Sequence, residues 1–225
     1  MMDKYLSANE ARAAIVEMGH RLIEKRLVAG SWGNISCRAG QQTIAITPSG
    51  RSYEHLAPSD VVLLDNTGCV VGGERIPSSE SKLHVAIYAA CPEAQAVIHT
   101  HSIYASALAA MRRPVPAIIE DIVQICGGSV NCAEYAFPGT QELADAAVKA
   151  LAGRKAALLA NHGAVCWGKS LDDALVVAEI LEKAAQIAVI CSSCGGKVYE
   201  LDEADAAAMH SFYEQHYSKR QMGKE

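Results

Sequence analysis

The chain has 225 residues, of which 50% are apolar, and its formal net charge is −5. This length and composition are typical of one large domain with a substantial core, and they argue against a disordered chain. The mild acidity argues against a nucleic-acid partner, because phosphate backbones are bound by clustered Lys and Arg. We therefore expect residues 1–225 to form one domain that binds no nucleic acid.

Helical patterns begin at recognisable capping residues. Ser7 with Glu10 forms a capping box. Pro77 opens another helix, which places Glu80 in the first turn. No apolar stretch is long enough to cross a membrane and no apolar run begins the chain, so we expect a cytoplasmic protein. The predicted helices are, in chain order, 7–30, 77–91, 102–111, 140–151, 170–190 and 202–217.

Strand-like segments alternate with these helices. They are short, and several end in glycine- or proline-containing turns. The alternation predicts an α/β fold with mixed or antiparallel strands and with helices on the outside. The predicted strands are 42–47, 61–65, 69–71, 96–101, 156–160 and 165–167.

A pair of histidines ends one of these strands. His99 and His101 are two residues apart, so on a strand their imidazoles face the same side. Neutral imidazole suits a first-row metal such as zinc. Two strand-end histidines bonded to backbone or water would give the same pattern, and the pair alone does not decide between the two interpretations.

His162 adds a third imidazole from the end of a second buried strand. Three histidines give the open metal site of many enzymes, in which one position is left for substrate. Glu80 supplies a carboxylate that could act as a general base or as a metal ligand. A helix N-terminus also stabilises an acidic residue without any function, so the spacing leaves the role of Glu80 open.

Three loops of small polar residues suit a phosphate group. Glycine and hydroxyl residues let backbone N–H groups approach an anion closely, and helix N-termini favour anions. Each loop alone is also common as an ordinary turn or cap. No nucleotide-binding motif is present. The loop residues are Ser31 to Asn34, Thr47 to Gly50, and Ser78 with Ser79.

Together these segments resemble the class II aldolase/adducin family, and within it the L-fuculose-1-phosphate aldolase branch. The resemblance spans nearly the whole chain, and five motifs in the right order are far more specific than any one of them. The matching segments are Gly33-Asn34-Ile35-Ser36, Thr47-Pro48-Ser49-Gly50, Pro77-Ser78-Ser79-Glu80, His99-Thr100-His101 and Asn161-His162-Gly163.

The resemblance implies a single α/β domain with a central, mainly antiparallel sheet, assembled as a homotetramer with its sites between subunits. It implies that His99, His101 and His162 hold one divalent metal, with zinc expected and Mn²⁺, Co²⁺ or Fe²⁺ as alternatives. It assigns Glu80 as the acid/base, which in the resting enzyme also binds the metal. The residues that it assigns to the substrate phosphate are Ser31, Gly33, Asn34, Ser49, Gly50, Ser78 and Ser79.

The implied reaction is cleavage of a ketose 1-phosphate, such as L-fuculose 1-phosphate or a related deoxy-pentulose phosphate. It would release dihydroxyacetone phosphate and a short aldehyde. Breaking the bond leaves a carbanion, which the metal would stabilise as an enediolate while Glu80 moves the proton.

One segment departs from the fuculose-type pattern. Those enzymes carry a tyrosine there as proton donor to the aldehyde oxygen, whereas residues 116–128 of this chain contain none. We expect Glu120 or Asp121 to take over part of that role. Tyr217 resembles a C-terminal tyrosine that reaches a neighbouring subunit's site, although an ordinary packed tyrosine would look the same.

Other functions remain open at this point. A ribulose-phosphate 4-epimerase of the same family would use the same bond cleavage, and Asp121 is compatible with it. However, Ser79-Glu80 resembles the aldolase form of that motif. A dehydratase or decarboxylase relative is a third possibility. A non-catalytic adducin-like scaffold would be expected to lack metal ligands, whereas all three histidines and Glu80 are present.

Overall fold

The computed structural model of the chain describes residues 5–195 and 197–217. Its centre is one eight-stranded sheet in the order β4-β3-β2-β1-β5-β8-β7-β6. Neighbouring strands are antiparallel, except that β6 and β7 are parallel. The strands are β1 (Asn34–Arg38), β2 (Thr43–Ile46), β3 (Val62–Asp65), β4 (Val70–Gly72), β5 (Ala96–Thr100), β6 (Cys132–Ala133), β7 (Ala156–Leu159) and β8 (Gly163–Gly168).

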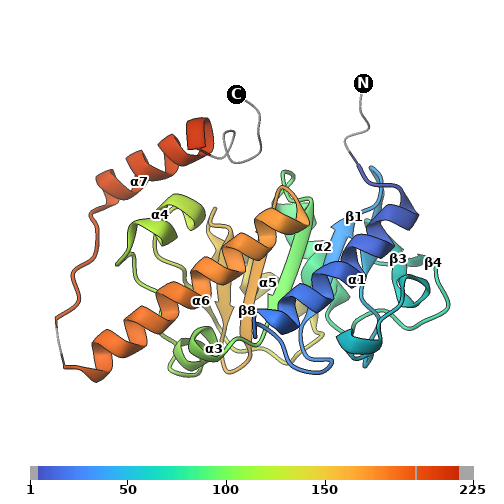
Figure 1. Cartoon of the computed structure of the whole chain (residues 1–225), viewed down its shortest axis with the longest axis horizontal. Helices are drawn as coiled ribbons and strands as arrows, with labels where there is room; N and C mark the ends of the chain where they lie inside the picture. Colours follow the sequence, from blue (N-terminus) through green and yellow to red (C-terminus); the bar gives the residue numbers. More distant parts are fainter. Residues whose placement is uncertain (1–4, 196, 218–225) are drawn as a thin grey trace.

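Helices cover both faces of the sheet (Figure 1). On one face, α1 and α6 pack against β1, β5 and β8, and α3 and α4 pack beside α6. On the other face, α2 and α5 pack against each other, and α5 contacts β7. The helices are α1 (Ala8–Glu24), α2 (Ser81–Ala90), α3 (Ile103–Ala110), α4 (Glu120–Cys126), α5 (Gln141–Leu151), α6 (Leu171–Ser193) and α7 (Glu203–Phe212), with short 3₁₀ turns at Tyr53–His55 and Pro58–Asp60.

Strand alternation decides which side chains face which helix layer. In β5, Ala96 and Ile98 join the core beneath α1 and α6, whereas Val97 joins the core beneath α2 and α5. His99 follows with the parity of Val97, so it faces α2. Asn34 lies directly opposite His99 in the register of β1 with β5. The fold therefore brings polar residues of two central strands to the N-terminal end of α2.

The structure confirms the predicted α/β sheet and most helix starts. Ser7 and Glu10 form the predicted capping box of α1, and Ser170 caps the long helix α6. The prediction that a helix opens at Pro77 was wrong, because α2 begins at Ser81 and Glu80 is its N-cap. Ser78 and Glu80 are therefore placed by the turn before the helix. Sequence patterns also missed β1, β6 and α4. The helix predicted over 202–217 is confirmed, as α7 followed directly by a π-helical turn that ends at Tyr217.

The end of the described chain folds back over α4. Helix α7 packs against α4 and continues into a π-helical turn, η3 (Tyr213–Tyr217) (Figure 1). Lys155 and Lys169 tether this turn through Glu214. Among the described residues, no helix is long and apolar enough to cross a membrane.

Candidate active site

Three histidine rings meet at the ends of β5 and β7. The ring centroids lie 4.7 Å apart for His99 and His101, 4.7 Å for His99 and His162, and 4.9 Å for His101 and His162. The Nε2 atoms of His99 and His101 are 2.9 Å apart. One nitrogen of each histidine lies within 4.8 Å of the others, which is close enough for one ion to bind all three.

Burial and one hydrogen bond fix the orientation of the His99 ring. It is fully buried, and its Nδ1–H donates to the carbonyl oxygen of Ala164 across the β5–β8 pair, at 2.9 Å. This bond places the proton on Nδ1 and leaves Nε2 as a free lone pair, as in many metal-binding histidines. Burial, together with the neighbouring rings of His162 and His101, holds the pKa of His99 well below its usual range. The imidazole is therefore neutral, as a metal ligand must be.

The other two histidines stand in loops that direct them toward His99. His162 follows a tight turn after β7, in which Asn161 has a φ of 57°, a left-handed conformation that asparagine tolerates better than most residues. His101 comes directly after β5. Burial and the ring of His162 lower its pKa. With the proton of His99 on Nδ1, the Nε2 atom of His99 is left to accept a hydrogen bond from His101 or to bind a cation shared with it.

Glu80 closes the group on the α2 side. Its carboxylate is buried, with Oε2 3.2 Å from Nε2 of His99 and Oε1 3.5 Å from Nε2 of His162. The side chain of Asn34 donates a 2.9 Å hydrogen bond to Oε2. The buried Oε1 has no hydrogen-bond partner among the described residues. A buried acceptor without a donor is costly, so this geometry favours a cation or a substrate hydroxyl at that point.

The donor set fits a divalent first-row metal. Three imidazole nitrogens with a carboxylate at their edge match the ligand types and number of catalytic zinc sites. The lowered pKa values of His99 and His101, the fixed tautomer of His99 and the Glu80 oxygen without a hydrogen-bond partner all favour a cation at this point. His99, His101 and His162, with Glu80 beside them, therefore form a candidate metal centre.

The centre opens into a cavity of about 440 Å³. Trp32 stands at its rim, 67% exposed, with its ring centroid 5.7 Å from that of His101. The loops of the other walls are built mainly of serine, asparagine, glycine and proline, and all the predicted phosphate residues are among them. The lining residues of the loops are Ser31, Gly33, Asn34, Pro48, Ser49, Gly50, Ser78, Ser79, Pro138 and Asn161.

Two of these loops are joined to each other by backbone hydrogen bonds. The N–H of Ser49 donates to the carbonyl of Ile76 at 2.9 Å, and the N–H of Ser78 donates to that of Thr47 at 3.0 Å. Asp60 also links the two loops, because its carboxylate pairs with Arg51 on one loop and with Arg75 beside the other. The loops thus form one rigid rim with two cations close behind it.

Comparisons with known proteins show the family of this chain. The family described as "Class II Aldolase and Adducin N-terminal domain" matches residues 13–189. The chain belongs to the class II aldolase/adducin family. The 5-deoxy-D-ribulose 1-phosphate aldolase of Bacillus thuringiensis serovar kurstaki is 40% identical over 82% of this chain and 86% of that protein. The L-fuculose phosphate aldolase of Escherichia coli strain K12 is 36% identical over 81% of this chain and 84% of that protein.

A solved structure shares the fold of this class II aldolase/adducin chain. It is an L-fuculose 1-phosphate aldolase with a TM-score of 0.88 and 36% identity, covering 94% of this chain and 99% of its own. The single α/β domain and central, mainly antiparallel sheet expected from the resemblance are confirmed.

The remaining predicted residues lie elsewhere in the single chain. Glu120 and Asp121 form the first turn of α4 and do not line the histidine cavity, and Asp121 pairs with Lys183 on α6. The assignment of either acid to the site stays a prediction. Tyr217 ends η3, and its side chain lies outside the described part of the structure.

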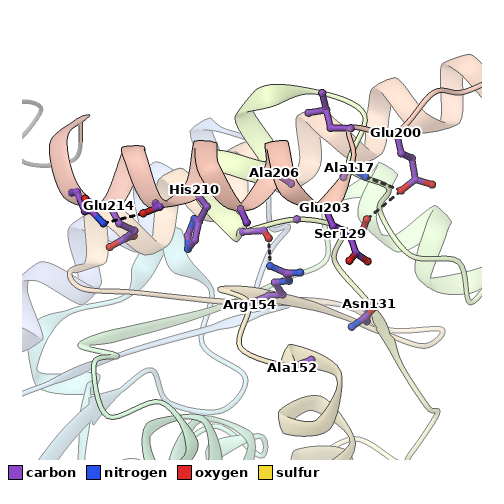
Figure 2. A pocket seen from close by; sticks show the side chains of 16 residues that line it. Ala117, Ser129, Asn131, Ala152, Arg154, Glu200, Glu203, Ala206, His210 and Glu214 are labelled. Carbon is purple, nitrogen blue, oxygen red and sulfur yellow. Dashed lines mark hydrogen bonds between the residues drawn. The ribbon is translucent and has the colours of Figure 1, made fainter.

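A second cavity, of about 770 Å³, lies elsewhere in the described structure. It lies between α7 and the segments around Gly127 and Arg154, and Figure 2 shows Arg154, His210 and Glu200 on its walls. Arg154 donates to the carbonyl of Gly127, and Nδ1 of His210 lies 2.7 Å from that of Gln124. It contains none of the metal-centre residues, so volume alone does not identify the reactive site of this class II aldolase/adducin chain.

Sequence reasoning missed the residues behind Glu80. His84, Ser36 and Tyr88 are buried and joined to Asn34 by hydrogen bonds. Burial is the main cause that lowers the pKa of His84 to about 3, and His99 adds to it. The signal was available: His84 lies four residues after Glu80, which on a helix puts both on one face.

Proposed function

We propose that this class II aldolase/adducin chain is a metal-dependent aldehyde-lyase that cleaves a ketose 1-phosphate to dihydroxyacetone phosphate and a short aldehyde. The observation that carries the proposal is the meeting of three histidines and one buried carboxylate beside a cavity lined by loops of small residues. The names of the relatives support the same chemistry. L-Fuculose 1-phosphate and a 5-deoxypentulose 1-phosphate are the substrates that we favour.

His99, His101 and His162 would hold one divalent ion per chain, for which we favour Zn²⁺ over Mn²⁺, Co²⁺ or Fe²⁺. Such an ion supplies Lewis-acid polarisation of the substrate oxygens, which the bond cleavage requires. The protein's part is to hold three imidazoles aimed at one point. The hydrogen bond from His99 to Ala164 supports this role, because it fixes both tautomer and ring orientation.

Glu80 would move the proton at the carbon that is left after cleavage. Its carboxylate is buried at the inner end of the cavity, within 3.2–3.5 Å of two of the histidines. A general base must lie within hydrogen-bond reach of the proton that it takes, and an oxygen without a donor is available for this. In the resting state the same carboxylate would bind the metal.

The rim would hold the substrate phosphate. Its donors are backbone N–H groups and the side chains of Ser31, Ser49, Ser78 and Ser79, with Gly33 and Gly50 allowing close approach. Arg51 and Arg75 add positive charge behind these neutral donors. Binding the phosphate away from the reacting bond would orient the substrate for cleavage.

A second subunit would complete the aldehyde side of the site, so we propose a homotetramer with sites at subunit interfaces. Exposed apolar side chains near the cavity support this assembly, among them Trp32 at 67% and Ile76 at 79% exposure. Glu120, Asp121 and Tyr217 would then act in a neighbouring subunit's site. Eight free cysteines support a reducing, cytoplasmic location.

A cleavage assay tests this function. Purified metal-loaded protein is given L-fuculose 1-phosphate, 5-deoxyribulose 1-phosphate and L-ribulose 5-phosphate, and the three-carbon product is measured. We expect dihydroxyacetone phosphate from at least one ketose 1-phosphate. Interconversion of pentulose 5-phosphates without a three-carbon product would instead identify an epimerase, and metal-free, inactive protein would identify a scaffold.

A further inference from the structure

A network of hydrogen-bonded, buried polar side chains extends from Glu80 into the core between α2 and β1. Asn34 donates to Glu80 at 2.9 Å, and Oδ1 of Asn34 lies 2.5 Å from Nε2 of His84. The network continues from Nδ1 of His84 to the hydroxyl of Ser36 at 2.6 Å, and from there to the hydroxyl of Tyr88 at 2.9 Å. The contact between Asn34 and His84 is shorter than an ordinary hydrogen bond, and the other contacts are ordinary in length.

The fold places these residues in two aligned columns. Glu80, His84 and Tyr88 are four residues apart and lie on one face at the start of α2. Asn34 and Ser36 are two apart and face that helix from β1. His84 and Ser36 are 0% exposed, so neither can turn to water for a partner. The hydrogen bonds of these two side chains must therefore be made to other protein groups.

The donor and the acceptor of each hydrogen bond can be assigned by starting from the carboxylate of Glu80. A carboxylate only accepts, so the group of Asn34 facing Glu80 is its NH₂ and the group facing His84 is its carbonyl oxygen. That oxygen needs a donor, so the proton of the neutral His84 ring sits on Nε2. Nδ1 of His84 must then accept, and the hydroxyl of Ser36 donates to it. Tyr88 in turn donates to Ser36.

We infer that His84 is a positioning residue for Glu80. Its Nε2–H holds the carbonyl end of Asn34, and so keeps the NH₂ end of that amide toward the carboxylate. If the amide turned over, two acceptors would face each other at 2.9 Å, which would push Glu80 away from its place beside the histidines. Asn34 also lines the cavity, so one amide links the proposed phosphate rim to the proposed acid/base.

This inference rests on the proposed role of Glu80, and three variants test it. His84→Leu removes both ring nitrogens, whereas His84→Gln keeps one donor and one acceptor. Ile87→Ala is the matched control, because Ile87 is a fully buried residue of α2 in the apolar core that touches none of these bonds. The readouts are bound metal, KM and kcat for cleavage, and the rate of solvent-hydrogen exchange into dihydroxyacetone phosphate.

For His84→Leu we expect kcat and exchange to fall about 10- to 100-fold, as is usual when a partner behind a reactive group is lost, with KM and bound metal within about twofold of the parent. His84→Gln should recover most of the loss, and Ile87→Ala should keep the parental kcat. Full kcat in His84→Leu, no recovery in His84→Gln, or an equal loss in Ile87→Ala would each overturn the inference. An inactive parent protein would instead count against the proposed function.

A measurement on the unmodified protein does not depend on activity or on the folding of a variant. Nitrogen NMR of protein labelled in its imidazoles reports the tautomer of each ring, and the signal of His84 is assigned by its loss in His84→Gln. We expect a neutral ring protonated at Nε2 from pH 5 to pH 9. A ring protonated at Nδ1, or a charged one in this range, would overturn the inference.

Discussion

Replacing Gly33 with alanine should disturb the metal centre through one backbone contact. A Cβ on Gly33 would lie 2.6 Å from the carbonyl oxygen of His99 and 2.9 Å from Cγ1 of Val28. Carbon and oxygen approach to about 3.3 Å in close unstrained contacts, so the strand carrying His99 must move by roughly 0.7 Å. Reactive constellations tolerate only about 0.5 Å of displacement. We therefore expect metal affinity to fall about 10- to 100-fold.

Gly30→Ala is the matched control for this prediction. Both glycines have positive φ, 82° for Gly33 and 61° for Gly30, but a Cβ on Gly30 meets nothing within 4 Å. Left-handed strain of about 1–2 kcal/mol is thus common to both variants, and overpacking of about 1–3 kcal/mol is confined to Gly33→Ala. The assays are urea denaturation of the metal-free proteins and calorimetric titration with Zn²⁺. Equal metal affinity in the two variants would refute the argument.

Two further predictions concern single carboxylates. Glu80→Gln should keep the fold and most of the bound metal but abolish solvent-hydrogen exchange into dihydroxyacetone phosphate, and undiminished exchange would remove Glu80 from its role. Burial raises the pKa of Glu214, but Lys155 and Lys169 outweigh this and lower it to about 2. Its ion pairs therefore stabilise the fold above the ordinary glutamate pKa of 4.5 and are lost as the pH falls toward 2. Glu214→Gln should flatten the pH dependence of unfolding over that range; an unchanged slope would contradict the assignment.

Much of the fold could be predicted from the sequence because the strongest patterns involve residues that lie close together in the chain. Capping residues such as Ser7 and Ser170 sit where the backbone N–H groups of one helix end need acceptors, and their partners are three residues away. The strand β1 was missed because Asn34 and Ser36 put polar side chains on a face that is buried only when α2 covers it. Whether this face of β1 is buried depends on its contact with α2, so the sequence of the segment alone does not show it.

In the candidate site too, some residues could be predicted from the sequence and others could not. His99, His101 and His162 were predicted from strand-end spacing and family resemblance, and the structure brings their rings together. The role of His84 could not be assigned from spacing, because it depends on a hydrogen bond to Asn34, 50 positions away. In the homotetramer that we propose, Glu120 and Tyr217 would act in a neighbouring subunit's site, and one chain's fold does not test that assignment.

The most direct test of the whole account is whether one metal ion, held by the three histidines, is needed for cleavage. The protein is stripped with a chelator, titrated with Zn²⁺, and assayed for release of dihydroxyacetone phosphate from the ketose 1-phosphate that is cleaved fastest, alongside His101→Ala. We predict that activity returns in proportion to bound zinc and reaches its limit near one ion per chain, and that His101→Ala neither binds zinc at that site nor recovers. Full activity in the stripped protein or in His101→Ala would contradict the metal centre proposed here.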